Sequence, residues 1–327
     1  MNNDRILEVR DLKTYFKIRE GIVKAVDGVS FTLEKGESLG LVGESGCGKT
    51  TTALSIIKLL SDNGYIESGE IVFKGINLAH MTEEEILTHR WKDISMIFQG
   101  AMNSMNPVMK ISQQITEVIR LHEPQVTLEE ARKRVRELFK LVNLDPGLMD
   151  SYPHEFSGGM RQRAIIAMSL ALNPSLIIGD EPTTALDVMV QAQIIDLIND
   201  LRKKLGMSMI MITHDLSIIA ETCDRVVVMY GGKVAEIGPV EEIIRNYRHP
   251  YTEKLIKAFP NIYGEREMVA SIPGVPPNLI DPPKGCLFAP RCHRKIGKIC
   301  DEVAPELKAV SRDRHFVACH LWGEGHE

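Results

Sequence analysis

The sequence lacks several features that would assign it to specialised classes of protein. No apolar run approaches the ~18 residues that a membrane-spanning helix requires. The formal net charge is −5, so no excess of positive charge favours nucleic acid or an anionic membrane surface as a partner. Residues 1–5 contain no basic region that leads into an apolar core. We therefore expect no secretory signal and a cytosolic chain.

The sequence also contains no internal repeat and no sustained heptad pattern. What it does contain is ordinary for a globular protein: 44% of its residues are hydrophobic and 25% are charged. At 327 residues the chain is too long for one small core, since domains usually run to about 100–200 residues. We expect one large domain followed by a smaller appendage.

A glycine-rich loop dominates the first part of the chain and has the pattern G-x-x-x-x-G-K-[ST]. An apolar stretch that predicts a buried strand precedes it, and the Ala- and Leu-rich stretch Thr51–Leu60, which predicts a helix, follows it. Strand, loop and helix in this order are typical of a phosphate-binding loop. Its residues are Gly43, Glu44, Ser45, Gly46, Cys47, Gly48, Lys49, Thr50 and Thr51.

Each residue type in this loop suits the binding of a nucleoside triphosphate. The glycines let the backbone curl, so that N–H groups point at phosphate oxygens, and the helix N-terminus adds its positive dipole end. Lys49 supplies a full positive charge, and the Thr50 hydroxyl can ligate Mg²⁺.

Polar side chains follow three further apolar stretches that predict buried strands. Gln99 follows Ile94–Phe98, and His214 follows the predicted strand Ser208–Thr213. Asp180 and Glu181 end the apolar stretch that begins at Leu176. The ends of such strands open on ligand crevices in α/β proteins. Asp180 suits Mg²⁺, and Glu181, one residue on, suits polarisation of an attacking water.

Two other features suit a nucleotide site, although each has an ordinary structural alternative. Tyr15 lies between two predicted strands, where its ring either stacks on a base or packs in the core. Ser157, Gly158 and Gly159 precede a predicted helix, Met160–Leu172. Ser157 is a good N-cap, and the glycines permit close backbone approach, so this helix start suits an anion or is simply capped.

Between the two halves of the α/β pattern, Ile111–Leu141 predicts an inserted helical region. Thr127–Glu130 forms a capping box, and apolar residues recur after it at helical spacing. Arg225–Tyr230 and Lys233–Gly238 predict a hairpin, with helices over Val240–Tyr247 and Tyr251–Phe259. A proline-rich stretch over residues 260–283 then predicts an ordered linker.

Taken together, these motifs resemble the nucleotide-binding subunit of an ABC transporter, over nearly all of residues 1–258. The resemblance implies that Gly43–Thr51 is Walker A and that Ser157, Gly158 and Gly159 belong to the family signature. The usual Leu-Ser-Gly-Gly-Gln of that signature has Phe156 and Met160 at its ends here.

The resemblance also implies roles for the polar groups. Tyr15 would stack on the base, and Gln99 would sense Mg²⁺ and the membrane partner. Asp180 would be the Walker B aspartate that ligates Mg²⁺, and Glu181 the catalytic glutamate. Residues 185–187 would form the D-loop, and His214 would be the switch histidine.

The fold class implied is an α/β P-loop NTPase of the ABC type, with an antiparallel β subdomain and a helical subdomain over about residues 105–172. Residues 1–258 would form the nucleotide-binding domain, and residues 259–327 a C-terminal extension. ATP would be hydrolysed at a head-to-tail dimer interface, with a second ATPase subunit that is either a paralogue or the same chain. Two transmembrane permease subunits would complete the transporter at the cytoplasmic face of the membrane.

Within the family, the chain most resembles dipeptide and oligopeptide importers. Ile272–Pro277, Gly285–Cys292 and His249–Thr252 carry this resemblance. It implies peptide import with an extracytoplasmic binding protein as an indirect partner. Nickel importers are close relatives and remain an alternative. A non-transport ABC ATPase is less favoured, because such chains usually carry two cassettes or a long coiled coil.

Four of the six cysteines, Cys286, Cys292, Cys300 and Cys319, lie in the extension with the spacing C-x5-C-x7-C-x18-C. This spacing lacks the C-x2-C pairs of zinc ribbons and bacterial ferredoxins. Four thiolates suit Zn²⁺ or an iron–sulfur cluster, and a small extension needs a staple. A disulfide or free thiols are the alternatives. The resemblance favours a [4Fe–4S] cluster, with Zn²⁺ second, so we expect a metal-stapled extension.

Overall fold

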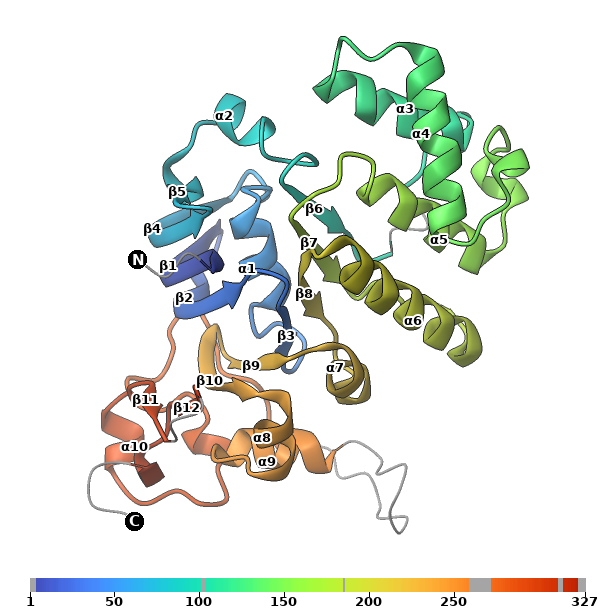
Figure 1. Ribbon diagram of the computed structural model, residues 1–327. Helices are drawn as coiled ribbons and strands as arrows, with labels where there is room; N and C mark the ends of the chain where they lie inside the picture. Colours follow the sequence, from blue (N-terminus) through green and yellow to red (C-terminus); the bar gives the residue numbers. More distant parts are fainter. Residues whose placement is uncertain (1–3, 101–103, 185, 259–271, 311–313, 323–327) are drawn as a thin grey trace. The chain divides into compact units, whose positions relative to one another are not determined.

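The computed structural model describes the chain in five stretches: residues 4–100, 104–184, 186–258, 272–310 and 314–322. The chain divides into two compact units. The first unit comprises Met1–Leu33, Ser38–His80 and Ile212–Glu327, and the second comprises Glu34–Glu37 and Met81–Met211. Each unit is described by itself, and Figure 1 labels its elements.

The first unit contains an antiparallel sheet with the strand order β2-β1-β4-β5. Its strands are β1 (Arg5–Ile18), β2 (Gly21–Glu34), β4 (Gly64–Phe73) and β5 (Ile76–Asn77). Strand β1 pairs with β4 from Leu7 opposite Phe73 to Phe16 opposite Gly64. This sheet confirms the antiparallel part of the predicted fold, although β4 begins five residues before the predicted Gly69.

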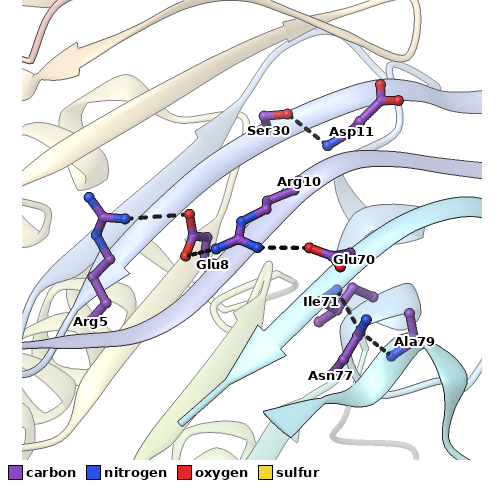
Figure 2. A network of polar contacts seen from close by, with 9 residues as sticks. All are labelled: Arg5, Glu8, Arg10, Asp11, Ser30, Glu70, Ile71, Asn77 and Ala79. Carbon is purple, nitrogen blue, oxygen red and sulfur yellow. Dashed lines mark hydrogen bonds and ion pairs between the residues drawn. The ribbon is translucent and has the colours of Figure 1, made fainter. Parts of the chain in front are cut away.

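Polar contacts lie across this sheet, as Figure 2 shows. The Arg10 guanidinium on β1 donates to Glu8 and to Glu70 of β4, both at 2.8 Å. The Asn77 side chain accepts hydrogen bonds from the N–H groups of Ile71 and Ala79, at 3.1 Å each. Since Arg10 and Glu70 are largely exposed, solvent screens this ion pair and it adds little to stability.

A second set of strands in the first unit has the order β11-β12-β10-β9-β3. These strands are β3 (Ser38–Val42), β9 (Arg225–Tyr230), β10 (Lys233–Pro239), β11 (Lys308–Ala309) and β12 (Phe316–Val317). Strand β3 is parallel to β9, and β9 and β10 form the predicted hairpin. All residues of β3 and β9 are buried, as expected for strands covered on both faces.

Helices of the first unit flank these strands (Figure 1). The α-helices are α1 (Lys49–Ile56), α7 (Leu216–Thr222), α8 (Val240–Arg245), α9 (Pro250–Lys257) and α10 (Ile299–Glu302). Short 3₁₀ turns are η1 (Leu78–His80), η5 (Ala289–Arg291) and η6 (His320–Trp322). Helix α9 begins at Pro250, directly after the N-cap His249, because proline suits the first helical position.

The second unit combines buried strands with a group of helices. Its strands have the order β8-β7-β6 and are β6 (Ile94–Ile97), β7 (Leu176–Asp180) and β8 (Ser208–Ile212). Its helices are α2 (Glu83–Leu87), α3 (Ile111–His122), α4 (Leu128–Leu141), α5 (Gly158–Ser169) and α6 (Val188–Leu205), with 3₁₀ turns η3 (Pro146–Leu148) and η4 (Pro153–Glu155). Strands β6 and β7 are parallel.

The predicted helical insertion consists of two helices, with a break between His122 and Leu128. The Thr127 capping box forms, with Glu130 closing it, so this start signal is confirmed. Helices α3, α4 and α5 pack on one another (Figure 1). Asp150 joins two of these elements, because it accepts hydrogen bonds from Arg132 of α4 and Ser112 of α3. These bonds, that with Arg132 first, lower the Asp150 pKa to about 2.

Candidate functional site

The glycine-rich loop follows β3 directly, and α1 begins at Lys49, two residues before the predicted Thr51. Gly43 and Gly48 have φ values of 147° and 103°, which side chains rarely adopt. A Cβ at Gly43 would lie 2.2 Å from the Met229 carbonyl oxygen, and one at Gly48 would lie 2.4 Å from that of Ala25. The backbones of β9 and β2 therefore leave room only for glycine at these two positions.

Lys49 lies inside the curl of this loop. Its Nζ donates to the carbonyl oxygens of Gly43 at 2.7 Å and Glu44 at 3.1 Å. Cys47, a residue of the loop, has a buried side chain, and burial raises the pKa of its thiol. Ser45, Gly46 and Thr50 are exposed, and Thr51 is half-buried. The loop thus presents its polar residues outward around a lysine that is already in place.

Tyr15 lies on β1 of the antiparallel sheet and is half-buried. Its ring packs edge-on against Tyr65 of β4, at 6.3 Å between centroids. Its hydroxyl donates to Asp27 at 2.9 Å, and burial raises its pKa above the usual range. Lys233 also binds Asp27, at 3.0 Å. These contacts fix the ring, and the stacking role stays a prediction.

Asp180 and Glu181 stand at the end of β7. Asp180 is buried, with 2% of its surface exposed, whereas Glu181 is half-buried. Glu181 has φ 47°, a left-handed conformation that is uncommon for a residue other than glycine. Residues held in this way concentrate at functional sites.

Gln99 contacts Glu181, because the two residues follow β6 and β7, which are neighbouring parallel strands. Its Nε2 donates to Glu181 Oε2 at 2.8 Å, and the Thr184 hydroxyl donates to the same oxygen at 3.0 Å. The sequence placed Gln99 and Glu181 in one crevice, and the two side chains are in direct contact. Thr184 was not predicted to take part.

The predicted second helix start is found at α5. Ser157 is its N-cap, and its hydroxyl accepts the N–H of Met160 at 3.3 Å. Gly158 begins the helix, which is two residues earlier than predicted. Gly159 lies against α6, where a Cβ would come within 2.7 Å of Val190 Cγ1. The close approach expected of this glycine is made to the protein's own helix.

His214 follows β8 and is exposed. It lies in the first unit, together with Tyr15 and the loop Gly43–Thr51. Gln99, Asp180, Glu181 and the Ser157–Gly159 segment lie in the second unit. Of the predicted D-loop, Ala185 lies outside the described residues, while Asp187 is the N-cap of α6. The first part of the predicted linker, residues 259–271, also lies outside them.

The cysteine prediction needs correction. Burial first, and then the charges of Cys286, Cys292 and Cys300, raise the pKa of the Cys319 thiol to about 11. Across the described ranges, however, no three His, Cys, Asp or Glu side chains form a group that could hold a metal ion. The structure therefore does not support the predicted [4Fe–4S] cluster, the Zn²⁺ alternative or a metal staple.

Packing against the other elements of the first unit holds the extension. Phe288 is 1% exposed and packs on Tyr230 and Tyr251, with ring centroids at 5.2 and 5.3 Å. Strand β12 pairs with β10, and the ring of His315 donates to the buried Glu236 at 2.7 Å. The predicted need for a staple assumed that the extension must form a core of its own, whereas these contacts bury its side chains against other elements of the unit.

Sequence reasoning missed one contact at the phosphate loop. Arg291 of the extension forms a two-point ion pair with Glu44, at 2.6 and 2.9 Å, and the Tyr251 hydroxyl accepts the N–H of Glu44 at 2.8 Å. In the sequence, the stretch around Arg291 indicates only the resemblance to peptide importers. No local pattern names Glu44 as its partner, since 247 positions separate the two residues.

Comparison with known proteins agrees with this geometry. A family described as ABC transporter matches residues 26–184, and one described as oligopeptide/dipeptide transporter, C-terminal region, matches residues 235–300. The oligopeptide transport ATP-binding protein OppD of Bacillus subtilis is 50% identical over 97% of this chain and 89% of its own length. The dipeptide transport ATP-binding protein DppD of the same organism is 43% identical over 97% and 95%.

A solved dimeric ATP-binding cassette, in a post-hydrolysis state with ADP and Pi, shares the fold. It matches with a TM-score of 0.64 and 26% identity over 72% of this chain and 98% of its own. This match confirms the predicted cassette fold. No helix in the described residues has the length and hydropathy needed to span a membrane. Fold, loop and relatives agree that the chain belongs to the ABC transporter family of ATP-binding proteins and is an ABC ATPase.

Proposed function

We propose that this chain is the ATP-hydrolysing subunit that powers import of dipeptides or oligopeptides through an ABC transporter. One observation carries the proposal: a phosphate loop at Gly43–Thr51 shares one chain with an oligopeptide/dipeptide transporter C-terminal region over residues 235–300. The curated relatives OppD and DppD, which match nearly the whole chain, are named for peptide transport. A nickel importer is not favoured, because these names point to peptides.

Residues of both units have proposed roles in nucleotide binding. The N–H groups of the loop and Lys49 bind the phosphates, and Tyr15 stacks on the base. The residues predicted to ligate Mg²⁺, Thr50 of α1, Asp180 at the end of β7 and Gln99, each carry an oxygen atom of the kind that Mg²⁺ prefers. When bound with ATP, Mg²⁺ neutralises charge that develops on the phosphates.

Glu181 is the proposed base for hydrolysis. Its carboxylate orients a water for attack on the γ-phosphorus and receives the proton as the bond to ADP breaks. Gln99 and Thr184 both donate to the same Glu181 oxygen, and these hydrogen bonds fix the orientation of the carboxylate. His214 follows a buried strand and is proposed to contact the γ-phosphate.

In the proposed assembly, a second ATPase subunit supplies the signature segment that completes each nucleotide site. Ser157, Gly158 and Gly159 of one ATPase subunit face the phosphate loop of a second subunit, which is a paralogue or a second copy. Two transmembrane permease subunits bind this pair at the cytoplasmic face of the membrane, and an extracytoplasmic peptide-binding protein delivers the substrate. The dimeric cassette among the solved structures supports the pairing.

Substitution of Glu181 by Gln tests the proposed chemistry. Removal of the base is expected to slow ATP turnover by at least about 100-fold, with ATP affinity unchanged, because a general base contributes about 10²–10⁴-fold. Turnover and nucleotide affinity would be measured in the assembled transporter. Glu137→Gln, which changes an exposed carboxylate on α4, is the matched control. Wild-type turnover in the Glu181 variant would reject the assigned role.

Transport assays test the substrate. Vesicles that contain the assembled transporter are expected to take up a labelled dipeptide or oligopeptide with ATP, and the Glu181→Gln transporter is expected not to. Uptake of nickel without uptake of peptides would overturn the peptide assignment and leave the ATPase intact.

A further inference from the structure

Arg291 uses every N–H group of its guanidinium, five in all, in hydrogen bonds. Nη1 and Nη2 each donate to one Glu44 carboxylate oxygen, and Nη1 also donates to the Tyr230 hydroxyl at 3.1 Å. Nε and Nη2 donate to the carbonyl oxygens of Pro273 and Ile272, both at 2.9 Å. Only 4% of the side chain is exposed. A side chain so completely bonded has one defined position.

Glu44, the second residue of the phosphate loop, is held from three directions. Arg291 binds its carboxylate, and the Tyr251 hydroxyl accepts its N–H. Its carbonyl oxygen accepts Lys49 Nζ at 3.1 Å and the N–H of Cys47 at 3.2 Å. The chain of contacts therefore runs from the extension, through Glu44, to the lysine of the loop.

The elements that carry Arg291 and Tyr251 are themselves rigidly placed. Arg291 ends the turn η5, which begins at the buried Ala289, next to the buried Phe288. Tyr251 is fully buried in the first turn of α9, where His249 Nδ1 accepts its N–H at 3.0 Å. Both side chains reach the loop from the chain beyond residue 248, outside every nucleotide-binding motif that the sequence displays.

A carboxylate in a phosphate-binding loop presents a physical difficulty. It would repel the phosphates, and the two-point pair with Arg291 neutralises it. The same pair restrains the loop before the ligand arrives, which lowers the ordering cost of binding. We propose that Arg291 is a positioning residue for ATP binding, through which the C-terminal extension forms part of the nucleotide site. This inference rests on the proposed use of the loop for ATP.

The test compares Arg291→Ala, Glu44→Ala and the double variant in the assembled transporter, with ATP affinity, KM, kcat and thermal unfolding measured for each. Arg291→Ala is expected to raise the Kd and KM for ATP about tenfold, equivalent to about 1.4 kcal/mol. The expected kcat stays within about twofold, because the lost interaction is made in ground and transition states alike. Arg294→Ala, which removes an exposed charge three residues away, is the matched control.

Comparison of the single and double variants tests whether Arg291 acts on ATP affinity through Glu44. In the Glu44→Ala background, Arg291→Ala is expected to change ATP affinity little, because the pair is already broken. An equal loss in both backgrounds, or a lower unfolding temperature with unchanged ATP affinity, would overturn the inference. If Arg291→Ala does not fold, Arg291→Lys replaces it, since lysine keeps the charge but loses the two-point geometry. A wild-type protein that binds no ATP would instead reject the proposed function.

Discussion

At the scale of single residues, hydrogen bonds surround the buried carboxylate of Glu236. Glu236 is fully buried, and its carboxylate accepts the N–H groups of Arg248 at 2.7 Å and His249 at 2.9 Å, as well as His315. His249 is 3% exposed and uses Nδ1 as an acceptor for the Tyr251 N–H. Burial, opposed by the Glu236 charge, lowers the His249 pKa to about 4. The residue thus folds in its neutral form.

This lowered pKa predicts acid sensitivity. The unfolded chain binds a proton at His249 near pH 6.5 and the folded chain only near pH 4, so stability is full above about pH 6.5 and falls as pH drops between these values. The loss reaches about 3 kcal/mol, at 1.36 kcal/mol for each pH unit. Asn at this position still caps α9 but does not titrate. Urea unfolding between pH 4 and 8 should show this contribution in the wild type and not in His249→Asn.

The control for this measurement is His80→Asn, at an exposed position on η1. It should leave the pH dependence as it is in the wild type. An unchanged pH dependence in His249→Asn would contradict a neutral buried histidine.

At the scale of elements, close packing at helix starts sets the geometry of the candidate site. Helix α5 begins at the Ser157 cap, and α6 begins at the Asp187 cap, whose carboxylate accepts the N–H of Val190 at 2.9 Å. Val190 in turn lies against Gly159 of α5. The position of the signature segment thus depends on the first turn of a helix that starts thirty residues later in the chain.

Substitution of Gly159 by Ala should separate these two helix starts. Val190 is β-branched and stiff in a helix, so it cannot yield easily to a Cβ at 2.7 Å. We expect a loss of about 1–3 kcal/mol in the free energy of unfolding, as is usual for overpacking. Removing the obstacle with Val190→Ala in the same chain should recover part of this loss. Urea unfolding of both single variants and the double variant measures it, and losses that simply add would contradict the contact.

At the scale of the whole chain, the extension packs on the other elements of the first unit through aromatic contacts and paired polar groups. Phe288, Tyr230 and Tyr251 form its apolar contact. The Trp322 indole donates to the Arg248 carbonyl at 2.9 Å, and the Arg248 guanidinium lies over the indole ring at 4.6 Å. Residues far beyond the cassette motifs therefore help to stabilise the strand and helices that carry Tyr230 and Tyr251.

Phe288→Ala should reveal the strength of this docking. A buried phenylalanine cut back to alanine costs about 3–5 kcal/mol, through lost burial and the cavity that remains. We expect a lower midpoint in urea unfolding of the full chain and faster proteolysis of the extension. Val275→Ala, at a side chain that is 82% exposed, should change neither. A Phe288 variant as stable as the wild type would show that other contacts hold the extension.

Much of the fold followed from patterns in the sequence. The hairpin β9–β10 and the Thr127 capping box formed at or within a residue of their predicted places, and the predicted loop lies between β3 and α1, although α1 begins two residues before the predicted Thr51. The predicted helical insertion consists of two helices. Strand β4 began earlier than predicted, because pairing with β1 extends a strand beyond its apolar residues. Within the second unit, the polar groups at the ends of β6 and β7 led to the contact between Gln99 and Glu181.

The sequence by itself determined the strand–loop–helix unit, the family and the residues proposed for ATP chemistry, because these depend on short-range backbone geometry and on residue types at close spacing. Only the tertiary structure decided what holds the extension and what surrounds Glu44. The pair between Glu44 and Arg291, and the seat of Phe288, depend on side chains brought together by the packing of β9, α9 and η5. No periodicity or local spacing encodes such long-range matches of shape and charge.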